Sequence, residues 1–193
     1  MTPDDPETAR TTLMTLEAFA DTIVPGQRRW PGDRAIAGVS AGGGAVTAGA
    51  VDLLRTQAGG LAEMLDSLAM SLNGHALQYT AANSPSVEEA GADPLPPFVA
   101  LPFADRTELV RTLTAPGHPE KELWVAMAMF SNMAFDTGAH LTTTEAFASG
   151  HPGLLTMGFQ PPDPDGIWRF PDFSYRRQLA EPHPATTPSG SPA

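Results

Sequence analysis

The 193-residue sequence contains no cysteine and only one lysine, Lys121. Without thiols the chain can form no disulfide, iron–sulfur cluster, cysteine-ligated zinc site or cysteine nucleophile. Basic residues are few, because 11 Lys and Arg oppose 22 Asp and Glu and leave a formal net charge of −11. Such an acidic chain is repelled by nucleic acid and by anionic lipid, so the sequence predicts neither as a partner.

Long apolar runs are also missing. The most apolar stretch, residues 123–135, contains Ser131 and Asn132 and is shorter than the about 20 residues that a membrane-spanning helix needs. Residues 1–7 are acidic and broken by prolines, whereas a secretory signal is basic and then apolar. We therefore expect a cytoplasmic protein without a membrane partner.

The composition is that of a folded protein, and its pattern is helical. Hydrophobic residues make up 41% of the chain and charged residues 17%, unlike a disordered chain. Apolar residues recur at helical spacing from Leu13 to Ile23, where Pro25 and Gly26 end the pattern. Comparable helical patterns follow in residues 46–54, 61–79, 105–115, 119–133 and 142–150. The predicted fold class is all-α, with five to six helices in a compact domain over residues 11–160.

Two pairs of residues have the spacing of a helix-capping box. Asp105 and Glu108 predict one helix start, and Thr142 and Glu145 predict another. On the first predicted helix, Glu17 and Asp21 are four residues apart, and like charges at this spacing usually lie in water.

The helix predicted near residues 119–133 is rich in methionine. Its predicted buried stripe consists of Leu123, Ala126, Met127, Phe130 and Met133. Methionine also suits adaptable surfaces, but we interpret Met127, Met129 and Met133 as core residues.

Both ends of the chain differ from this domain. Residues 1–10 read as a disordered N-terminus, and residues 181–193 as a disordered tail. Residues 161–180 combine prolines with the aromatic side chains of Trp168, Phe170, Phe173 and Tyr175. Aromatic side chains gain most from burial, so this segment is predicted to be a long extended arm that lies on a surface.

Residues 38–42 match G-x-S-x-G, the nucleophile elbow of serine hydrolases. That elbow needs a strand before Ser40 and a parallel sheet around it, and the sequence predicts neither. The glycines that follow, Gly42, Gly43 and Gly44, could present backbone N–H groups to a phosphate, but no phosphate-binding signature surrounds them. Close packing of this glycine loop on another chain is at least as plausible an interpretation.

A metal or acid–base site is conceivable where His140 and His151 flank Glu145. The sequence contains no H-E-x-x-H motif, and surface or capping roles are the simpler interpretation of these histidines. We predict no catalytic, cofactor-binding or metal-binding residue in this chain.

The phrase Leu16 to Gly26, L-E-A-F-A-D-T-I-V-P-G, is the most distinctive one in the chain. It resembles the opening helix of the gluconate 2-dehydrogenase subunit 3 family, in which an L-x-x-x-A-D-x-I-[IVL]-P phrase precedes a loop and an A-G-V follows. The A-G-V is matched at residues 37–39, and Met157 to Phe159 with the proline-rich end resembles the family's C-terminal arm.

The resemblance implies a small, non-catalytic subunit that binds, stabilises or matures a larger FAD-dependent oxidoreductase of the glucose-methanol-choline type. FAD would then be bound by the partner, and no cofactor by this chain. Classical members carry a twin-arginine signal, which this N-terminus lacks, so a cytoplasmic variant is expected. The expected partner-binding residues are the glycine loop at residues 42–44 and the four aromatic residues of the arm.

Two alternatives remain open at this point. The chain could be a stand-alone enzyme, either a hydrolase using Ser40 or a metal-dependent enzyme using His140, Glu145 and His151. It could also be a self-associating structural protein that swaps its C-terminal arm between copies.

Overall fold

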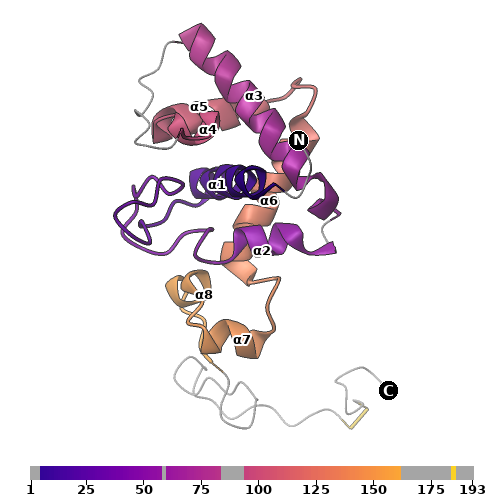
Figure 1. Cartoon of the computed structure of the whole chain (residues 1–193). Helices are drawn as coiled ribbons and strands as arrows, with labels where there is room; N and C mark the ends of the chain where they lie inside the picture. Colours follow the sequence, from indigo (N-terminus) through magenta and orange to yellow (C-terminus); the bar gives the residue numbers. More distant parts are fainter. Residues whose placement is uncertain (1–4, 58–59, 84–93, 162–183, 186–193) are drawn as a thin grey trace. The chain divides into compact units, whose positions relative to one another are not determined.

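A computed structural model describes residues 5–57, 60–83, 94–161 and 184–185 (Figure 1). The chain divides into two units, residues 1–159 and residues 160–193. The predicted arm, residues 161–180, and the predicted tail, residues 181–193, lie almost wholly outside the described residues. The four aromatic residues of the arm are among the residues that the structure does not describe.

All regular secondary structure of the described residues is helical, and no strand occurs among them. The all-α class is therefore confirmed. The elements are α1 Pro6–Ile23, α2 Ala50–Arg55, a 3-10 turn Ala62–Met64, α3 Leu65–Asn83, α4 Pro97–Ala100, α5 Phe103–Leu113, α6 Lys121–Thr137, α7 Thr143–Ala148 and α8 Pro152–Thr156.

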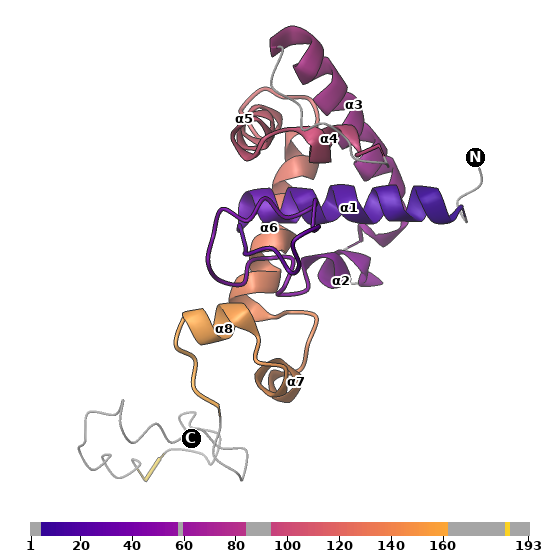
Figure 2. The ribbon, with the colours of Figure 1, turned by 60° about the vertical axis from the view of Figure 1, so that its left-hand side comes forward.

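The first unit is built around α1, which packs against α2, α3, α4, α5 and α6 (Figures 1 and 2). This helix begins at Pro6, a residue type suited to the first turn, so the disordered start predicted for residues 1–10 is too long. Helix α8 packs against the end of α6, and α7 lies beside α8 in both views.

The main core lies where α1, α3, α4, α5 and α6 meet. Its largest side chains, Trp124, Phe19 and Phe98, are fully buried. A second cluster of small residues, including Ala20, Ala50 and Ala134, lets α2 approach α1 and α6 closely.

The buried face of α6 differs from the predicted stripe. The fully buried residues are Trp124, Met127, Ser131 and Ala134. Both buried polar groups have a hydrogen-bond partner, as burial requires. The Trp124 Nε1–H donates to Glu120 at 3.0 Å, and the Ser131 Oγ donates to the Met127 carbonyl at 2.9 Å. Met127 is fully buried, so the prediction that it is a core residue is confirmed.

The other two methionines of α6 are not core residues, because 58% of Met129 and 36% of Met133 is exposed. The buried face of α6 contains Trp124, and Met129 and Met133 lie on the helix outside that face.

One of the two predicted capping boxes exists. Thr142 Oγ1 accepts from the Glu145 N–H, and the Glu145 carboxylate accepts from the Thr142 N–H at 2.8 Å. The box predicted at Asp105 and Glu108 is wrong. Helix α5 begins at Phe103 after Pro102, and Asp105 instead accepts a hydrogen bond from Tyr79.

Candidate functional site

The loop between α1 and α2 is held in place by a carboxylate of α1. Asp21 is fully buried, and its two oxygens accept the backbone N–H groups of Gly26 at 2.9 Å and Ala37 at 2.8 Å. Burial raises the pKa of Asp21 above its ordinary value even though both N–H donors favour the charged form. The prediction that Asp21 lies in water is wrong, because its partners come from the loop and not from its own helix.

Glu17, one turn earlier, fixes the outer part of the same loop. The Arg29 guanidinium forms two hydrogen bonds with Glu17, at 2.6 and 2.7 Å, and a third with Asp33 at 2.7 Å. The hydrogen bonds with Glu17 raise the pKa of Arg29. Burial opposes ionisation of Asp33, but its hydrogen bond and ion pair with Arg29 outweigh burial and lower the pKa of Asp33. The side chain of Glu17 is only 12% exposed, so its predicted position in water is also wrong.

The start and end of the loop pair with each other. The Gln27 N–H donates to the Gly42 carbonyl at 2.8 Å, and the Ala45 N–H donates to the Val24 carbonyl at 2.9 Å. An ideal Cβ on Gly44 would lie 2.6 Å from the Gly26 nitrogen, so this crossing requires a residue without a side chain. The phrase from Leu16 to Gly26 thus specifies a helix together with the anchor of its following loop.

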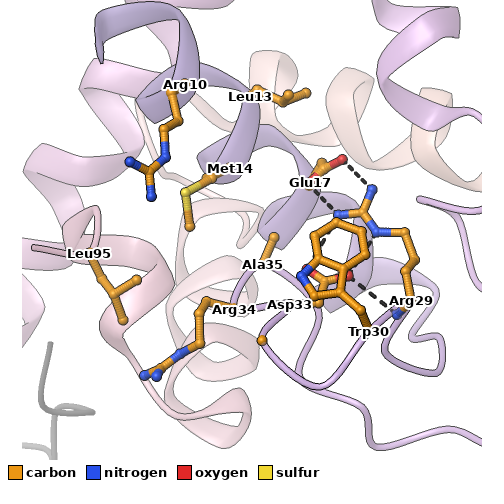
Figure 3. A pocket seen from close by; sticks show the side chains of 11 residues that line it. Arg10, Leu13, Met14, Glu17, Arg29, Trp30, Asp33, Arg34, Ala35 and Leu95 are labelled. Atoms are coloured by element: carbon orange, nitrogen blue, oxygen red, sulfur yellow. Dashed lines mark hydrogen bonds and ion pairs between the residues drawn. The ribbon is translucent and has the colours of Figure 1, made fainter. Parts of the chain in front are cut away.

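A pocket of about 560 Å³ opens between this loop and α1 (Figure 3). Figure 3 shows the Glu17–Arg29 pair, Asp33 and the Trp30 ring at one end, and Arg10 and Arg34 toward the other. The Trp30 ring lies 4.7 Å from the Arg29 guanidinium carbon and is 53% exposed. The apolar part of the lining consists of Leu13, Met14, Ala35 and Leu95. Sequence reasoning missed this pocket, because its residues belong to three separate segments.

A second hollow, which we call the α5–α6 groove, lies on another part of the first unit. It measures about 480 Å³ and is lined by Ile23, Val110, Thr114, Val125, Ala128, Met129, Asn132 and Met133. Apart from Thr114 and Asn132, every lining residue is apolar. The two exposed methionines therefore lie on an apolar concave surface, of the kind that adaptable protein contacts use.

The glycine loop packs mainly on its own chain. An ideal Cβ on Gly43 would lie 2.5 Å from the Pro152 Cβ, and Gly44 lies equally close to Val24 and Pro25. Gly42 has no atom within 4 Å of such a Cβ, so it alone offers an open surface. Close approach to a second chain is therefore not needed to explain Gly43 and Gly44.

Ser40 does not have the setting of a nucleophile elbow. It lies in the loop, and no strand precedes it in the part of the chain that the structure describes. Its Oγ accepts a long hydrogen bond, 3.4 Å, from the Gly42 N–H.

The groups at His140, Glu145 and His151 serve separate structural roles. Glu145 is exposed and forms the capping box of α7, whereas His151 is 3% exposed and its Nδ1 accepts the Leu154 N–H at the start of α8. His140 lies against Gly49, and burial lowers its pKa. Among the described residues, no three His, Asp or Glu side chains are grouped as a bound metal ion would require.

His140 Nδ1 and His151 Nε2 are nevertheless buried without a hydrogen-bond partner. Asp136 Oδ1, near the end of α6, is a third buried side-chain atom without a partner among the described residues.

None of the helices in the described ranges is long and apolar enough to cross a membrane. In comparisons with known proteins, the model of a family of unknown function, DUF5987, matches residues 10–193. No curated protein and no solved structure matches the chain.

Proposed function

We propose that this chain, which belongs to the family of unknown function DUF5987, is a non-catalytic small subunit of an oxidoreductase complex. Its partner would be a larger FAD-dependent oxidoreductase of the glucose-methanol-choline type, which this chain binds, stabilises or matures. FAD would be bound by the partner. A cytoplasmic setting is part of the proposal, and cell fractionation tests it.

The observation that carries the proposal is the α5–α6 groove. Met129, which is 58% exposed, lines it together with Val110 and Ile23. An exposed apolar hollow is unfavourable in water unless another molecule covers it. Flexible methionine side chains can adapt to the surface that covers them, which suits a subunit that binds a much larger protein.

The phrase that places Asp21, the residue that holds the loop after α1, is a second observation in favour of the proposal. The phrase that resembles the gluconate 2-dehydrogenase subunit 3 family includes Asp21, Pro25 and Gly26, and these residues shape the turn that follows α1. Ile23, the last residue of α1 and part of the same phrase, also lines the groove. The same short phrase therefore contributes to the fold and to the surface that we assign to the partner.

Co-expression tests the proposal directly. A flavoprotein of the glucose-methanol-choline type encoded beside this gene would be expressed with and without the chain. We expect co-elution in size-exclusion chromatography and a several-fold higher yield of soluble, FAD-loaded flavoprotein when both are present. A flavoprotein that is equally soluble, flavin-loaded and active alone would overturn the proposal.

A pair of matched variants tests the role of the groove. Met129→Glu places a charge in the apolar lining and should abolish co-elution, because a buried unpaired carboxylate opposes association. Met70→Glu makes the same change on α3, where Met70 is 68% exposed and does not line the groove, and should leave the complex intact. Equal loss with both variants, or with neither, would remove the groove from the proposal.

A further inference from the structure

Helix α3 carries a row of exposed residues that the core does not use, which we call the α3 stripe. Met70 is 68% exposed and Leu77 is 60% exposed, although both side chains are large and apolar. Gly74 lies between them on the same side of the helix, and a Cβ there would meet no atom within 4 Å. Ser67 and Ala81 are also exposed and extend the stripe by about one turn at each end.

The five residues of the α3 stripe follow one another at alternating intervals of three and four. This is the heptad spacing with which one helix packs along another. The other side of α3 is buried on α1, α4 and α5, through Leu65, Leu68, Ala69, Leu72 and Ala76. Helix α3 lies at the edge of the first unit in Figures 1 and 2, so its second apolar side is available to another molecule.

The surface around the α3 stripe is uncharged. After Asp66, α3 contains no Asp, Glu, Lys or Arg, and the exposed neighbours of the stripe include Ser71 and Gln78. The whole chain has a net charge of −11, so two copies repel each other wherever their acidic surfaces meet. A contact between two α3 stripes avoids most of this repulsion.

From these features we propose that the α3 stripe binds the α3 stripe of a second copy of the chain, with the two helices antiparallel. Large and small residues alternate along the stripe. In an antiparallel pair with two-fold symmetry, Met70 and Leu77 of one copy therefore pack against the small residues of the other. The surface is complementary to itself, which is the property that a symmetric dimer requires.

The antiparallel direction has two reasons. A parallel pair would place Met70 on Met70 and would leave a gap where Gly74 faces Gly74. It would also bring together Glu63 and Asp66 of both copies, acidic residues near the start of α3, whereas the antiparallel pair keeps them apart.

The contact is small, so the association is weak and reversible. Helix α3 has 19 residues and is about 28 Å long, and a pair of such helices buries on the order of 1,000 Å² in total. That area is at the lower limit for a specific interface, and we expect a dissociation constant of about 100 μM. The proposal does not depend on the proposed function, since the α3 stripe and the α5–α6 groove have no residue in common.

Sedimentation equilibrium of the full chain tests for the dimer. The concentration would run from about 5 to about 500 μM, which brackets the expected dissociation constant. The average mass should rise from that of a monomer toward that of a dimer. A chain that stays monomeric over the whole range would overturn the proposal.

A matched pair of variants locates the contact. Leu77→Glu places a carboxylate in the stripe and should raise the dissociation constant by about tenfold or more. Leu155→Glu makes the same change on α8, where Leu155 is 59% exposed, and should leave association unchanged. Both variants add one negative charge, so general repulsion affects them equally. Equal loss of association in both variants, or association unaltered in Leu77→Glu, would show that the copies meet elsewhere.

Crosslinking tests the antiparallel direction. The chain contains no cysteine, so a bismaleimide reacts only with introduced thiols. In the antiparallel pair Ser67 lies close to Ala81 of the second copy, whereas the two copies of Ser67 are about 15 Å or more apart. A short bismaleimide should link the Ser67→Cys variant to the Ala81→Cys variant in a mixture and should not link Ser67→Cys to itself. The opposite pattern would show a parallel pair and would contradict the proposal.

Discussion

Gly153 of α8 lies against the carbonyl of Phe135 in α6 with no room for a side chain between them. An ideal Cβ on Gly153 would be 1.6 Å from the Phe135 oxygen and 3.1 Å from its ring. Because this obstacle is backbone, it cannot turn aside as a flexible side chain would. The contact fixes α8 to the end of α6.

Gly153→Ala should therefore destabilise the first unit. We expect a loss of about 3 kcal/mol in the free energy of unfolding, at the upper end for overpacking a tight contact. Gly74→Ala is the matched control, because a Cβ at Gly74 in the middle of α3 meets no atom within 4 Å. That change should stabilise the protein by about 0.5–1 kcal/mol through helix propensity. Urea denaturation measures the change in the free energy of unfolding for both variants. Equal changes in Gly153→Ala and Gly74→Ala would contradict the packing argument.

Asp21→Asn should loosen the loop that follows α1. Both Asp21 oxygens accept backbone N–H groups, and an amide can replace only one of these acceptors. We expect a loss of about 1–3 kcal/mol, the usual result of leaving a buried donor unpaired. Hydrogen exchange at the Gly26 and Ala37 amides should accelerate.

The control for this change is Asp52→Asn, because the Asp52 side chain is 71% exposed. Its effect should stay within about 0.5 kcal/mol, as is usual for surface substitutions. Unchanged protection of the Gly26 and Ala37 amides in Asp21→Asn would show that Asp21 does not anchor the loop.

Stability should fall as the solution is acidified from neutral pH, with His140 as one cause. Burial lowers the pKa of His140 in the folded protein below the 6.5 of the free side chain. The unfolded chain then binds more protons than the folded one as the pH drops through about 6.5, so protonation favours unfolding. His140→Gln should flatten the dependence of the unfolding midpoint on pH between 7.5 and 5.5. A slope identical to that of the wild type would exclude this role.

Thr142→Ala should destabilise α7 by about 1 kcal/mol, because it removes one half of the capping box. Thr143→Ala, at the next position and also exposed, keeps the box and should have a much smaller effect. Amide exchange at Glu145 distinguishes the two variants, and similar protection in both would argue against the cap.

Local signals could be read from the sequence, and contacts between distant segments could not. The Thr142–Glu145 box was predictable because both partners lie within one turn. Asp105 has the same spacing to Glu108, but Tyr79 from α3 binds Asp105, and Arg111 binds Glu108. The Arg111–Glu108 pair lies within α5, but the contact of Tyr79 with Asp105 comes from a distant helix and has no signature in a short sequence window.

The same limit applies to the candidate site. Periodicity identified α1, but its carboxylates were assigned to water because their partners, Arg29 and the Ala37 N–H, come from the loop. In α6 the apolar pattern alone favoured Met133 for the core, whereas hydrogen bonds allowed Trp124 and Ser131 to be buried there. Both of these hydrogen bonds join residues four apart, so they only permit the burial. The packing of α2 and α1 against α6, which a short sequence window does not show, selects the buried face.

The contacts of Gly43 in the glycine loop, and of Gly49 just after it, also bear on the order of folding during synthesis. Gly43 packs on Pro152 and Gly49 on His140, so residues made early are covered by residues made late. Most of the domain must leave the ribosome before these contacts can form, and closing so large a loop is slow. A nascent chain halted before α7 would lack Pro152 and leave Gly43 uncovered, although Gly44 already packs on Val24 and Pro25. The last helices would then act as the step that completes the domain.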